Sequence, residues 1–236
     1  MSTTPEPYEY DIDNPLVYRN EMGRYKTDRQ LSFIRRVLAG KMRILDVGGG
    51  GGRLAIPLAQ LGHDITVVDI SAEALELLRS RTGETVAVAC SDLMSFAPSA
   101  TFDVTLVIDT LKYVSDASVA EAFAKVNSFL APGGLFVIAE INQGSWRNRL
   151  SERLGRRAGL RYNIATADGY RRALVSAGFE TVQEQGFLWM PLPFNSDSPL
   201  VRWFERVEAA LHLGSWVRQS PWLLIAARKV DAPRTA

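Results

Sequence analysis

The segment Ile44-Leu45-Asp46-Val47-Gly48-Gly49-Gly50-Gly51-Gly52 decides the fold of this chain. Its first four residues are mostly apolar and predict a buried strand. The five glycines that follow let the backbone turn sharply and approach a ligand with no Cβ in the way. Helical spacing of apolar residues then runs over 53–61. A strand, a glycine turn and a helix N-terminus together present free backbone N–H groups and a positive dipole end to a ligand.

The overall composition is that of an ordinary globular domain. The 236 residues are 47% hydrophobic and 22% charged, which suits one domain with a sizeable core. The formal net charge of +1 gives no global attraction to nucleic acid, so we expect no nucleic-acid partner. The single cysteine, Cys90, excludes an internal disulfide. There is neither a signal-peptide pattern nor an apolar run of the ~20 residues that a membrane span needs. We therefore expect a cytoplasmic protein with no integral membrane segment.

Short apolar runs alternate with helical patterns along the central part of the chain. The expected elements are strand 43–47, helix 53–61, strand 64–69, helix 72–81, strand 85–90, strand 104–109, helix 119–130 and strand 135–140. Ser71 suits the cap of the second helix, and Ser118 with Glu121 fits a capping box for the third. The stretch Leu130-Ala131-Pro132-Gly133-Gly134 signals a stop and a turn before the last strand. This alternation predicts an α/β fold with a mostly parallel sheet and helices on both faces.

Two further strands follow this core. A helix over 169–177 leads to a strand over 180–189, and the apolar run 222–227 suits an antiparallel edge hairpin with that strand. The predicted sheet therefore has seven strands.

The remaining segments are additions to this sheet. Asn14-Pro15 fits a helix start, and one or two helices are expected before Gly40. We interpret the chain as one domain over 1–236, in which 1–40 is an N-terminal helical cover and 41–140 is a cofactor-binding core. Residues 141–236 hold two substrate-side insertions, 142–168 and 190–221, and the final strands.

The glycine spacing alone fits two classes of ligand. Gly50, Gly52 and Ala55 match the dinucleotide pattern G-x-G-x-x-A, whereas Asp46, Gly48, Gly50 and Gly52 match acidic-x-G-x-G-x-G. In the second pattern the chain resembles the class I S-adenosylmethionine-dependent methyltransferases. Further motifs at this family's usual intervals support the resemblance over 42–140: Val67-Val68-Asp69-Ile70, Ser91-Asp92, Phe102-Asp103-Val104-Thr105 and Leu130 to Gly134. The resemblance implies a Rossmann-like class I methyltransferase fold and the cofactor S-adenosyl-L-methionine.

The chemistry of this cofactor suits the residues of these motifs. Asp46 can orient the ammonium group, directly or through water, and Asp69 can accept hydrogen bonds from both ribose hydroxyls. Asp92 and its backbone suit the adenine amine, although capping of the following turn is an open alternative for this side chain. A nicotinamide enzyme also needs an acid at Asp69, so Asp46 and Ser91-Asp92 discriminate between the two ligands. The glycines expected beside the methionine portion of the cofactor are Gly48, Gly50 and Gly52. For Gly49 and Gly51 an alternative stays open, in which they only make the loop more flexible and do not contact the cofactor.

Four further residues complete the predicted cofactor site. Ile70 and Leu93 follow the two acids at the ends of the second and third strands. Asp109 ends the fourth strand, where it either faces the cofactor or begins a turn. Tyr18, or else Arg24, is expected to reach the cofactor carboxylate from the N-terminal cover.

The catalytic candidates are Tyr113 and His212. Methyl transfer from a sulfonium is an in-line displacement in which alignment supplies much of the catalysis and a base helps a hydroxyl acceptor. Many relatives have Leu-x-His-Val after the fourth strand; here the stretch is Leu111-Lys112-Tyr113-Val114, with tyrosine at the histidine position. His212 is a base candidate in the second insertion, or else complements a helix C-terminus. We interpret His63 as structural, and without an HxxxH or CxxC pattern we expect no metal site.

The first insertion is strongly basic. Its charged residues over 147–161 are Arg147, Arg149, Arg153, Arg156, Arg157 and Arg161, against the single acid Glu152, with Trp146, Leu150, Leu154 and Leu160 interleaved. Three interpretations stay open: a wall that binds an anionic acceptor, an amphipathic helix on an acidic membrane that serves a lipid-like acceptor, and a solvated face.

The second insertion is rich in aromatic residues. Its apolar stripe at helical spacing consists of Leu200, Trp203, Phe204, Val207, Ala210 and Leu211. Such a stripe is more often core or a homodimer contact than a substrate pocket. Pro191, Pro193 and Phe194 have the alternative role of lining an apolar acceptor cleft, and the tyrosines of the N-terminal segment are expected to cover the site.

The sequence thus predicts methyl transfer to a small-molecule acceptor, either anionic or lipid-like. An oxygen acceptor is favoured because the chain lacks the Asn/Asp-Pro-Pro-aromatic motif of amino-group methylases of nucleic acids. Two alternatives are a catalytically silent S-adenosyl ligand-binding protein and a nicotinamide-dependent oxidoreductase.

Overall fold

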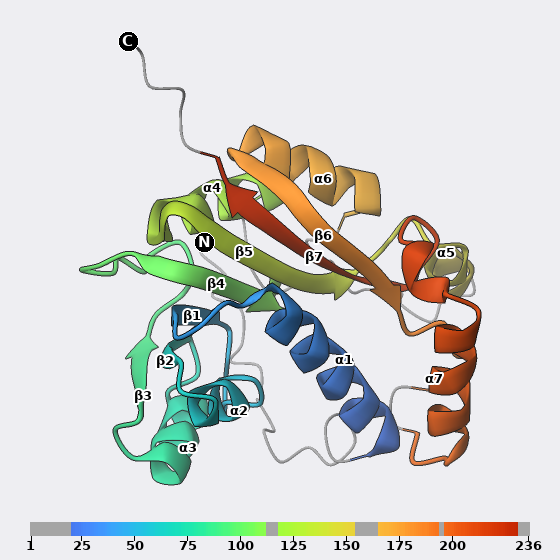
Figure 1. Ribbon diagram of the computed structural model, residues 1–236, viewed down its shortest axis with the longest axis horizontal. Helices are drawn as coiled ribbons and strands as arrows, with labels where there is room; N and C mark the ends of the chain where they lie inside the picture. The colour runs from blue at the N-terminus through green and yellow to red at the C-terminus, as the bar shows by residue number, and fades with distance from the viewer. Residues whose placement is uncertain (1–19, 112–117, 154–164, 194–195, 231–236) are drawn as a thin grey trace, which may run out of the picture.

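A seven-stranded sheet runs through the molecule (Figure 1). The computed structural model describes residues 20–111, 118–153, 165–193 and 196–230. The strands are β1 (Arg43–Val47), β2 (Asp64–Asp69), β3 (Val86–Cys90), β4 (Phe102–Ile108), β5 (Leu130–Ile141), β6 (Phe179–Phe187) and β7 (Trp222–Lys229). Their order is β3-β2-β1-β4-β5-β7-β6, in which β7 is antiparallel to both neighbours and the other pairs are parallel. The predicted fold class is confirmed.

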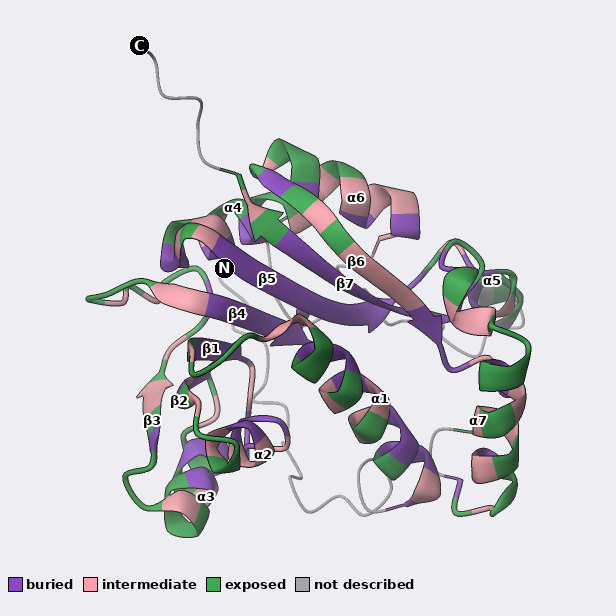
Figure 2. Ribbon diagram, viewed as in Figure 1, coloured by how far each residue is buried: buried purple, intermediate pink, exposed green. Residues whose placement is uncertain are grey.

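Helices cover both faces of this sheet. They are α1 (Glu21–Val37), α2 (Ala55–Gln60), α3 (Ala72–Thr82), α4 (Val119–Phe129), α5 (Trp146–Arg153), α6 (Ala167–Ser176) and α7 (Leu200–Ala210), with a 3-10 turn η2 (Leu213–Ser215). One hydrophobic core lies between the sheet and α1, α2 and α3, and the other lies between the sheet and α4 and α6. Successive residues of β1 point into opposite cores, Ile44 into the first and Leu45 into the second. Burial on both faces explains why β1, β4, β5 and β7 read as largely apolar runs (Figure 2).

The predicted caps are confirmed, and α1 has a cap of its own. Ser71 caps α3, and Ser118 with Glu121 forms a complete capping box on α4. The N-terminal helix begins at Glu21, where the Asn20 side chain accepts a hydrogen bond of 2.7 Å from the backbone N–H of Gly23. The predicted helix start at 14–15 lies outside the described residues.

One strand boundary was predicted wrongly. The strand expected over 135–140 begins at Leu130, which pairs with Phe102 before Val104 pairs with Leu135. The residues between these two pairs form an irregularity in which Gly133 has a φ of +69°. The Pro-Gly-Gly stretch is therefore a bulge inside the strand, because sheet pairing continues on both sides of it.

A membrane-crossing helix was neither expected nor found. Among the described residues, every helix is too short or too polar to cross a membrane.

Candidate cofactor and acceptor site

The glycine loop leaves β1 at the edge of the sheet where the parallel strands end. Gly48 has a φ of +71°, and a Cβ added there would lie 2.3 Å from the Thr110 side-chain oxygen. Gly50 and Gly52 also have positive φ values, of 49° and 86°. A Cβ on Gly49 would lie 2.7 Å from the Asp46 carboxylate, so this glycine permits a close approach and does more than relax the loop.

Asp46 lies beneath this loop as a buried acid. Its side chain is 2% exposed, and its Oδ2 atom has no hydrogen-bond partner among the described residues. Burial raises the pKa of the Asp46 carboxyl to about 7, with Asp69 adding to the rise and Arg53 opposing it. A buried acceptor of this kind suits a cationic hydrogen-bond donor from a ligand.

Asp69 connects the glycine loop to the end of β2. One carboxylate oxygen accepts a hydrogen bond of 2.9 Å from Gly50 N–H, and the other accepts one of 2.9 Å from Ser71 N–H. Each oxygen has a second lone pair, so the carboxylate can still accept from ligand hydroxyls. The neighbouring Ile70 side chain is 67% exposed and offers an apolar surface beside this acid.

Asp92 caps the turn after β3. Its Oδ1 atom accepts hydrogen bonds of 2.8 Å from Met94 N–H and 2.9 Å from Ser95 N–H, and hydrogen bonding to Ser95 lowers the pKa of the Asp92 carboxyl. The turn-capping role is therefore present, and the adenine role stays a prediction. Leu93 is buried in the core on the α4 side of the sheet, while the strand ends stay together because Ser91 N–H donates to Asp69 C=O.

Asp109 ends β4 in a group that we name the Asp109 cluster: Lys26, Gln30, Arg53 and Asp109. The Asp109 carboxylate lies 2.8 Å from Lys26 Nζ and 3.3 Å from an Arg53 nitrogen, and it accepts a hydrogen bond of 3.1 Å from Gln30. Arg53 also donates a hydrogen bond of 2.6 Å to the side-chain oxygen of Gln30. The cluster ties the glycine loop to α1, and the cofactor role of Asp109 stays a prediction.

Sequence reasoning missed three of these four residues. Lys26 and Gln30 lie four residues apart on α1, and both are buried. This spacing puts them on one side of a helix, but a polar pair looks the same in sequence whether it faces water or a carboxylate. Arg24, the alternative to Tyr18, pairs with Glu21 and Asp197.

The base candidates are only partly placed by the structure. Tyr113 lies outside the described residues. So does Tyr18, which was predicted to reach the cofactor carboxylate. His212 is exposed in a left-handed conformation between α7 and η2, which packs against β6 at the other end of the sheet from β1. Its base role stays a prediction. His63 accepts a hydrogen bond of 3.3 Å from Met42 N–H, which supports a structural role.

A buried glutamate orients the segment before Tyr113. Glu140, fully buried at the end of β5, accepts a hydrogen bond of 2.7 Å from Leu111 N–H. Sequence reasoning placed this residue only in a strand. Its position beside the end of β4 follows from the pairing of Ile108 with Ala139.

Hydrogen bonds connect the two insertions and α1. The Arg147 guanidinium donates to the carbonyls of Leu188, Met190 and Leu192, so this arginine is not part of a free basic wall. Tyr25 donates a hydrogen bond of 2.5 Å to Glu208 on α7. Burial raises the pKa of Glu208, whose other oxygen accepts from a backbone N–H at the end of β6. The two insertions and α1 are therefore connected by buried or partly buried hydrogen bonds.

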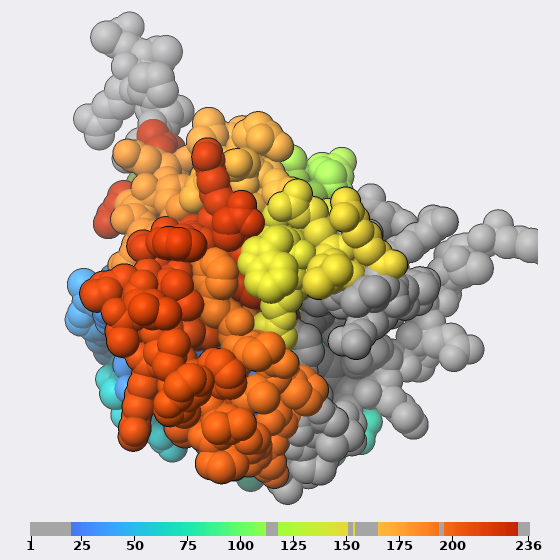
Figure 3. Space-filling view, turned by 90° about the vertical axis from the view of Figure 1, so that its right-hand side faces the viewer, coloured from blue at the N-terminus to red at the C-terminus, as the bar shows by residue number. Residues whose placement is uncertain are grey.

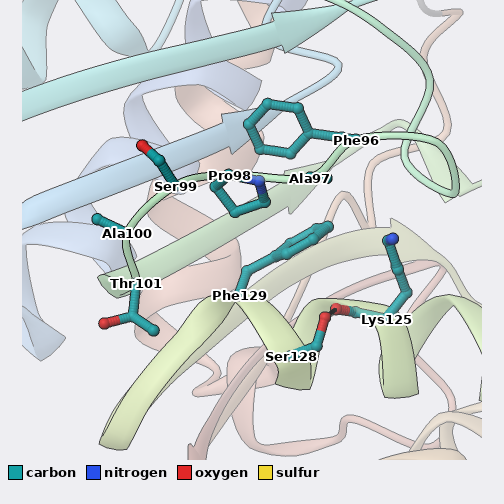
Figure 4. A pocket seen from close by; sticks show the side chains of 9 residues that line it. All are labelled: Phe96, Ala97, Pro98, Ser99, Ala100, Thr101, Lys125, Ser128 and Phe129. Atoms are coloured by element: carbon teal, nitrogen blue, oxygen red, sulfur yellow. Dashed lines mark hydrogen bonds between the residues drawn. The ribbon is translucent and has the colours of Figure 1, made fainter.

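A shallow hollow of about 290 Å³ lies away from this site (Figure 4). It lies between the segment joining β3 to β4 and the end of α4, with Phe96, Pro98, Lys125 and Phe129 among its lining residues. It borders Thr101, which precedes β4, so it opens at the opposite edge of the sheet from the glycine loop.

Comparisons with known proteins agree with this geometry. The sequence profile of the methyltransferase domain family matches residues 18–184. Two relatives are named ubiquinone biosynthesis O-methyltransferase: one from Caulobacter sp. (strain K31) is 31% identical over 43% of this chain and 42% of its own length, and one from Chelativorans sp. (strain BNC1) is 28% identical over 64% of each. The matched parts of the chain thus span 42% and 64% of the length of these two relatives.

Solved structures share the fold. A SAM-dependent methyltransferase from Thermotoga maritima, described as a possible histamine N-methyltransferase, aligns with a TM-score of 0.64 over 88% of this chain and 91% of its own, at 18% identity. Because the family profile covers well over half of the residues, the chain belongs to the methyltransferase domain family.

Proposed function

We propose that the chain transfers a methyl group from S-adenosylmethionine to an oxygen atom of a small molecule. One observation carries the proposal: Asp46, buried and with an unpartnered oxygen, lies under a glycine loop in which a Cβ at Gly48, Gly49 or Gly52 would clash with a neighbouring side chain. The residues present fit the cofactor that the family implies, because its ammonium group supplies the donor that Asp46 lacks. In this proposal the chain is one domain, with 41–140 holding the cofactor and 141–236 facing the acceptor.

Each residue of the site has a distinct part in this proposal. Asp46 binds the ammonium group, and Asp69 accepts from the ribose hydroxyls while its bond to Gly50 keeps the loop in place. Ile70 packs on the adenine, and Asp92 orients the third strand end and accepts from the exocyclic amine. When bound, the cofactor supplies an electrophilic methyl group on a sulfonium, and the protein aligns the acceptor behind it.

The acceptor is proposed to be a hydroxyl. Support comes from the O-methyltransferase names of the relatives and from the absence of the amino-group methylase motif in the sequence. The hydroxyl proton is accepted by Tyr113 or His212, which remain the two base candidates. The apolar character of the second insertion favours a lipid-like over an anionic acceptor. The exposed, unpaired Cys90 agrees with a cytoplasmic location.

Calorimetry and a transfer assay test this proposal. We expect S-adenosylmethionine and its demethylated product to bind and NAD not to bind, and we expect radiolabelled methyl to appear on a hydroxylated small molecule from a cell extract. Binding of NAD alone would contradict the proposal in favour of the nicotinamide enzyme. Binding of the S-adenosyl ligands without transfer to any acceptor would favour the silent ligand-binding protein.

A further inference from the structure

The described parts of the two insertions lie on one face of the molecule (Figure 3), and both expose apolar side chains. The set, which we name the tryptophan face, comprises Trp146, Leu150, Leu200, Trp203, Leu211 and Trp216, each 48–62% exposed. These residues lie on α5, on and just after α7, and just after η2, which Figure 3 shows next to one another. Contacts with neighbouring segments fix two of these parts: the Asn148 side chain of α5 donates a hydrogen bond of 2.8 Å to the carbonyl of Pro221, which precedes β7, and the ring centroids of Trp216 and Trp189, which follows β6, lie 6.5 Å apart.

The helix α7 has an unusual orientation. Its two glutamates face the protein: Glu208 binds Tyr25, and Glu205 lies within ion-pair distance of Arg29 on α1. Val201 and Phe204 also pack against the core, but the apolar residues Leu200 and Trp203 are more than half exposed. Surface helices normally bury the apolar side and expose the charged side. The exposed stripe therefore belongs to a surface that is covered in use.

The helix α5 exposes the same kind of surface. Trp146, Arg149, Leu150 and Arg153 are all exposed, and their spacing of three and four residues places them on one side of the helix. Asn148, on the opposite side, is buried. The described outer side of α5 thus consists of tryptophan, leucine and arginine.

The charge on this face is positive. Arg149, Arg153 and Arg206 are exposed, and none of them has an acidic partner among the described residues. Arginine binds phosphate groups well, and tryptophan prefers the boundary between lipid headgroups and acyl chains. We propose that the tryptophan face docks on the surface of an anionic lipid bilayer. This docking is independent of the methyl transfer proposed above.

A second copy of the chain fits this face less well. A twofold contact places the same patch on both partners, so the three arginines of one copy would approach those of the other. Like charges brought together in an interface are unfavourable. An anionic bilayer covers the apolar residues and neutralises the arginines together.

Vesicle flotation of the full chain tests the proposal. We expect the protein to float with vesicles of mixed phosphatidylglycerol and phosphatidylcholine and to stay behind with pure phosphatidylcholine. The variant R149Q/R153Q/R206Q should lose roughly fivefold in partitioning per arginine. The matched control R35Q/R79Q/R172Q removes three exposed arginines from α1, α3 and α6 and should bind like the wild type.

A second measurement follows the tryptophans of this face directly. Brominated phosphatidylglycerol should quench the fluorescence of the wild-type protein, and W146Q/W216Q should remove much of that quenching while cofactor binding remains. Equal binding to both vesicle types, or equal loss in both arginine triples, would overturn the proposal. The proposal would also be overturned if the wild-type protein did not bind vesicles, formed a dimer in sedimentation equilibrium, and lost that dimer in W146Q/W216Q. This result would assign the face to a second copy of the chain.

Discussion

The helix α1 forms ion pairs at both of its sides, and the two sets are built differently. On the cofactor side, Lys26 and Asp109 are 11% and 7% exposed. On the side that faces α7, which is the proposed acceptor side, Arg202 of α7 is 41% exposed and pairs with Glu21 and Asp28, which are 25% and 57% exposed. Water screens the second set and hardly reaches the first. The Asp109 side of α1 is therefore held by buried charges, whereas the α7 side is held by buried hydrogen bonds and by ion pairs that reach the surface.

The loop at Gly48 should be the most sensitive position on the cofactor side. We expect Gly48→Ala to abolish cofactor binding and to lower the free energy of unfolding by roughly 3 kcal/mol or more, from backbone strain plus the clash with Thr110. Denaturant unfolding and calorimetry measure the two effects. Gly40→Ala is the matched control, because Gly40 has a φ of +65° but open space around it. If both variants lower the free energy of unfolding by the same amount, the clash with Thr110 plays no part.

The buried cluster should be the next most sensitive. Lys26→Met leaves Asp109 with less positive charge and should cost about 3 kcal/mol in the free energy of unfolding, measured by chemical denaturation. Addition of salt should hardly change this difference. A loss within the range expected for exposed pairs, below about 1 kcal/mol, would mean that the two sides of α1 are not distinct.

Removal of the Asp46 charge should separate function from stability. Asp46→Asn should weaken S-adenosylmethionine binding on the order of 10- to 100-fold, because a charge-assisted hydrogen bond is lost. The thermal stability of Asp46→Asn without cofactor, measured near neutral pH, should equal or exceed that of the wild type. Asp103→Asn, which removes a half-exposed acid at the other edge of the sheet, is the control and should leave binding unchanged. Parallel loss of folding and binding in Asp46→Asn would contradict the assigned role.

The raised pKa of Asp46 should also appear as proton release. The folded protein keeps the Asp46 proton up to pH about 7, while the unfolded chain loses it near its ordinary value of about 4. Stability without cofactor should therefore fall as pH rises between these values. Cofactor affinity should rise over the same window, with about one proton released per cofactor bound below pH 7. Calorimetry in buffers of different ionisation enthalpy measures the release, and zero release in Asp46→Asn is the control.

The acceptor side should show the smallest effect. Arg202→Met breaks pairs that water already screens and should change the free energy of unfolding by less than about 1 kcal/mol. High salt should erase even this difference. A cost equal to that of Lys26→Met would remove the contrast between the two sides.

Local patterns predicted the sheet and the placement of Asp46, Asp69 and Asp92 at or just after the ends of its strands, because those features depend on neighbouring residues. Strands buried on both faces read as apolar runs, and Ser118 caps through a residue only three positions away. The roles of Lys26 and Gln30 could not be predicted, since Asp109 is brought to them by tertiary packing. The apolar stripe on α7 was recognised, but periodicity reports only that a helix has an apolar side. It cannot report that Val201 and Glu208 face inward while Trp203 faces out.

The placement of β7 has a consequence for how the chain folds during synthesis. This strand follows all the other described strands, yet it lies between β5 and β6, and its Trp222 ring stacks under the Lys26 ammonium at 3.6 Å. The growing chain emerges from the ribosome in sequence order. Until residues 222–229 emerge, β5 has an open edge, β6 has no partner, and α1 lacks the tryptophan beneath it. The cover over the cofactor side can close only after the distant end of the sheet has been translated.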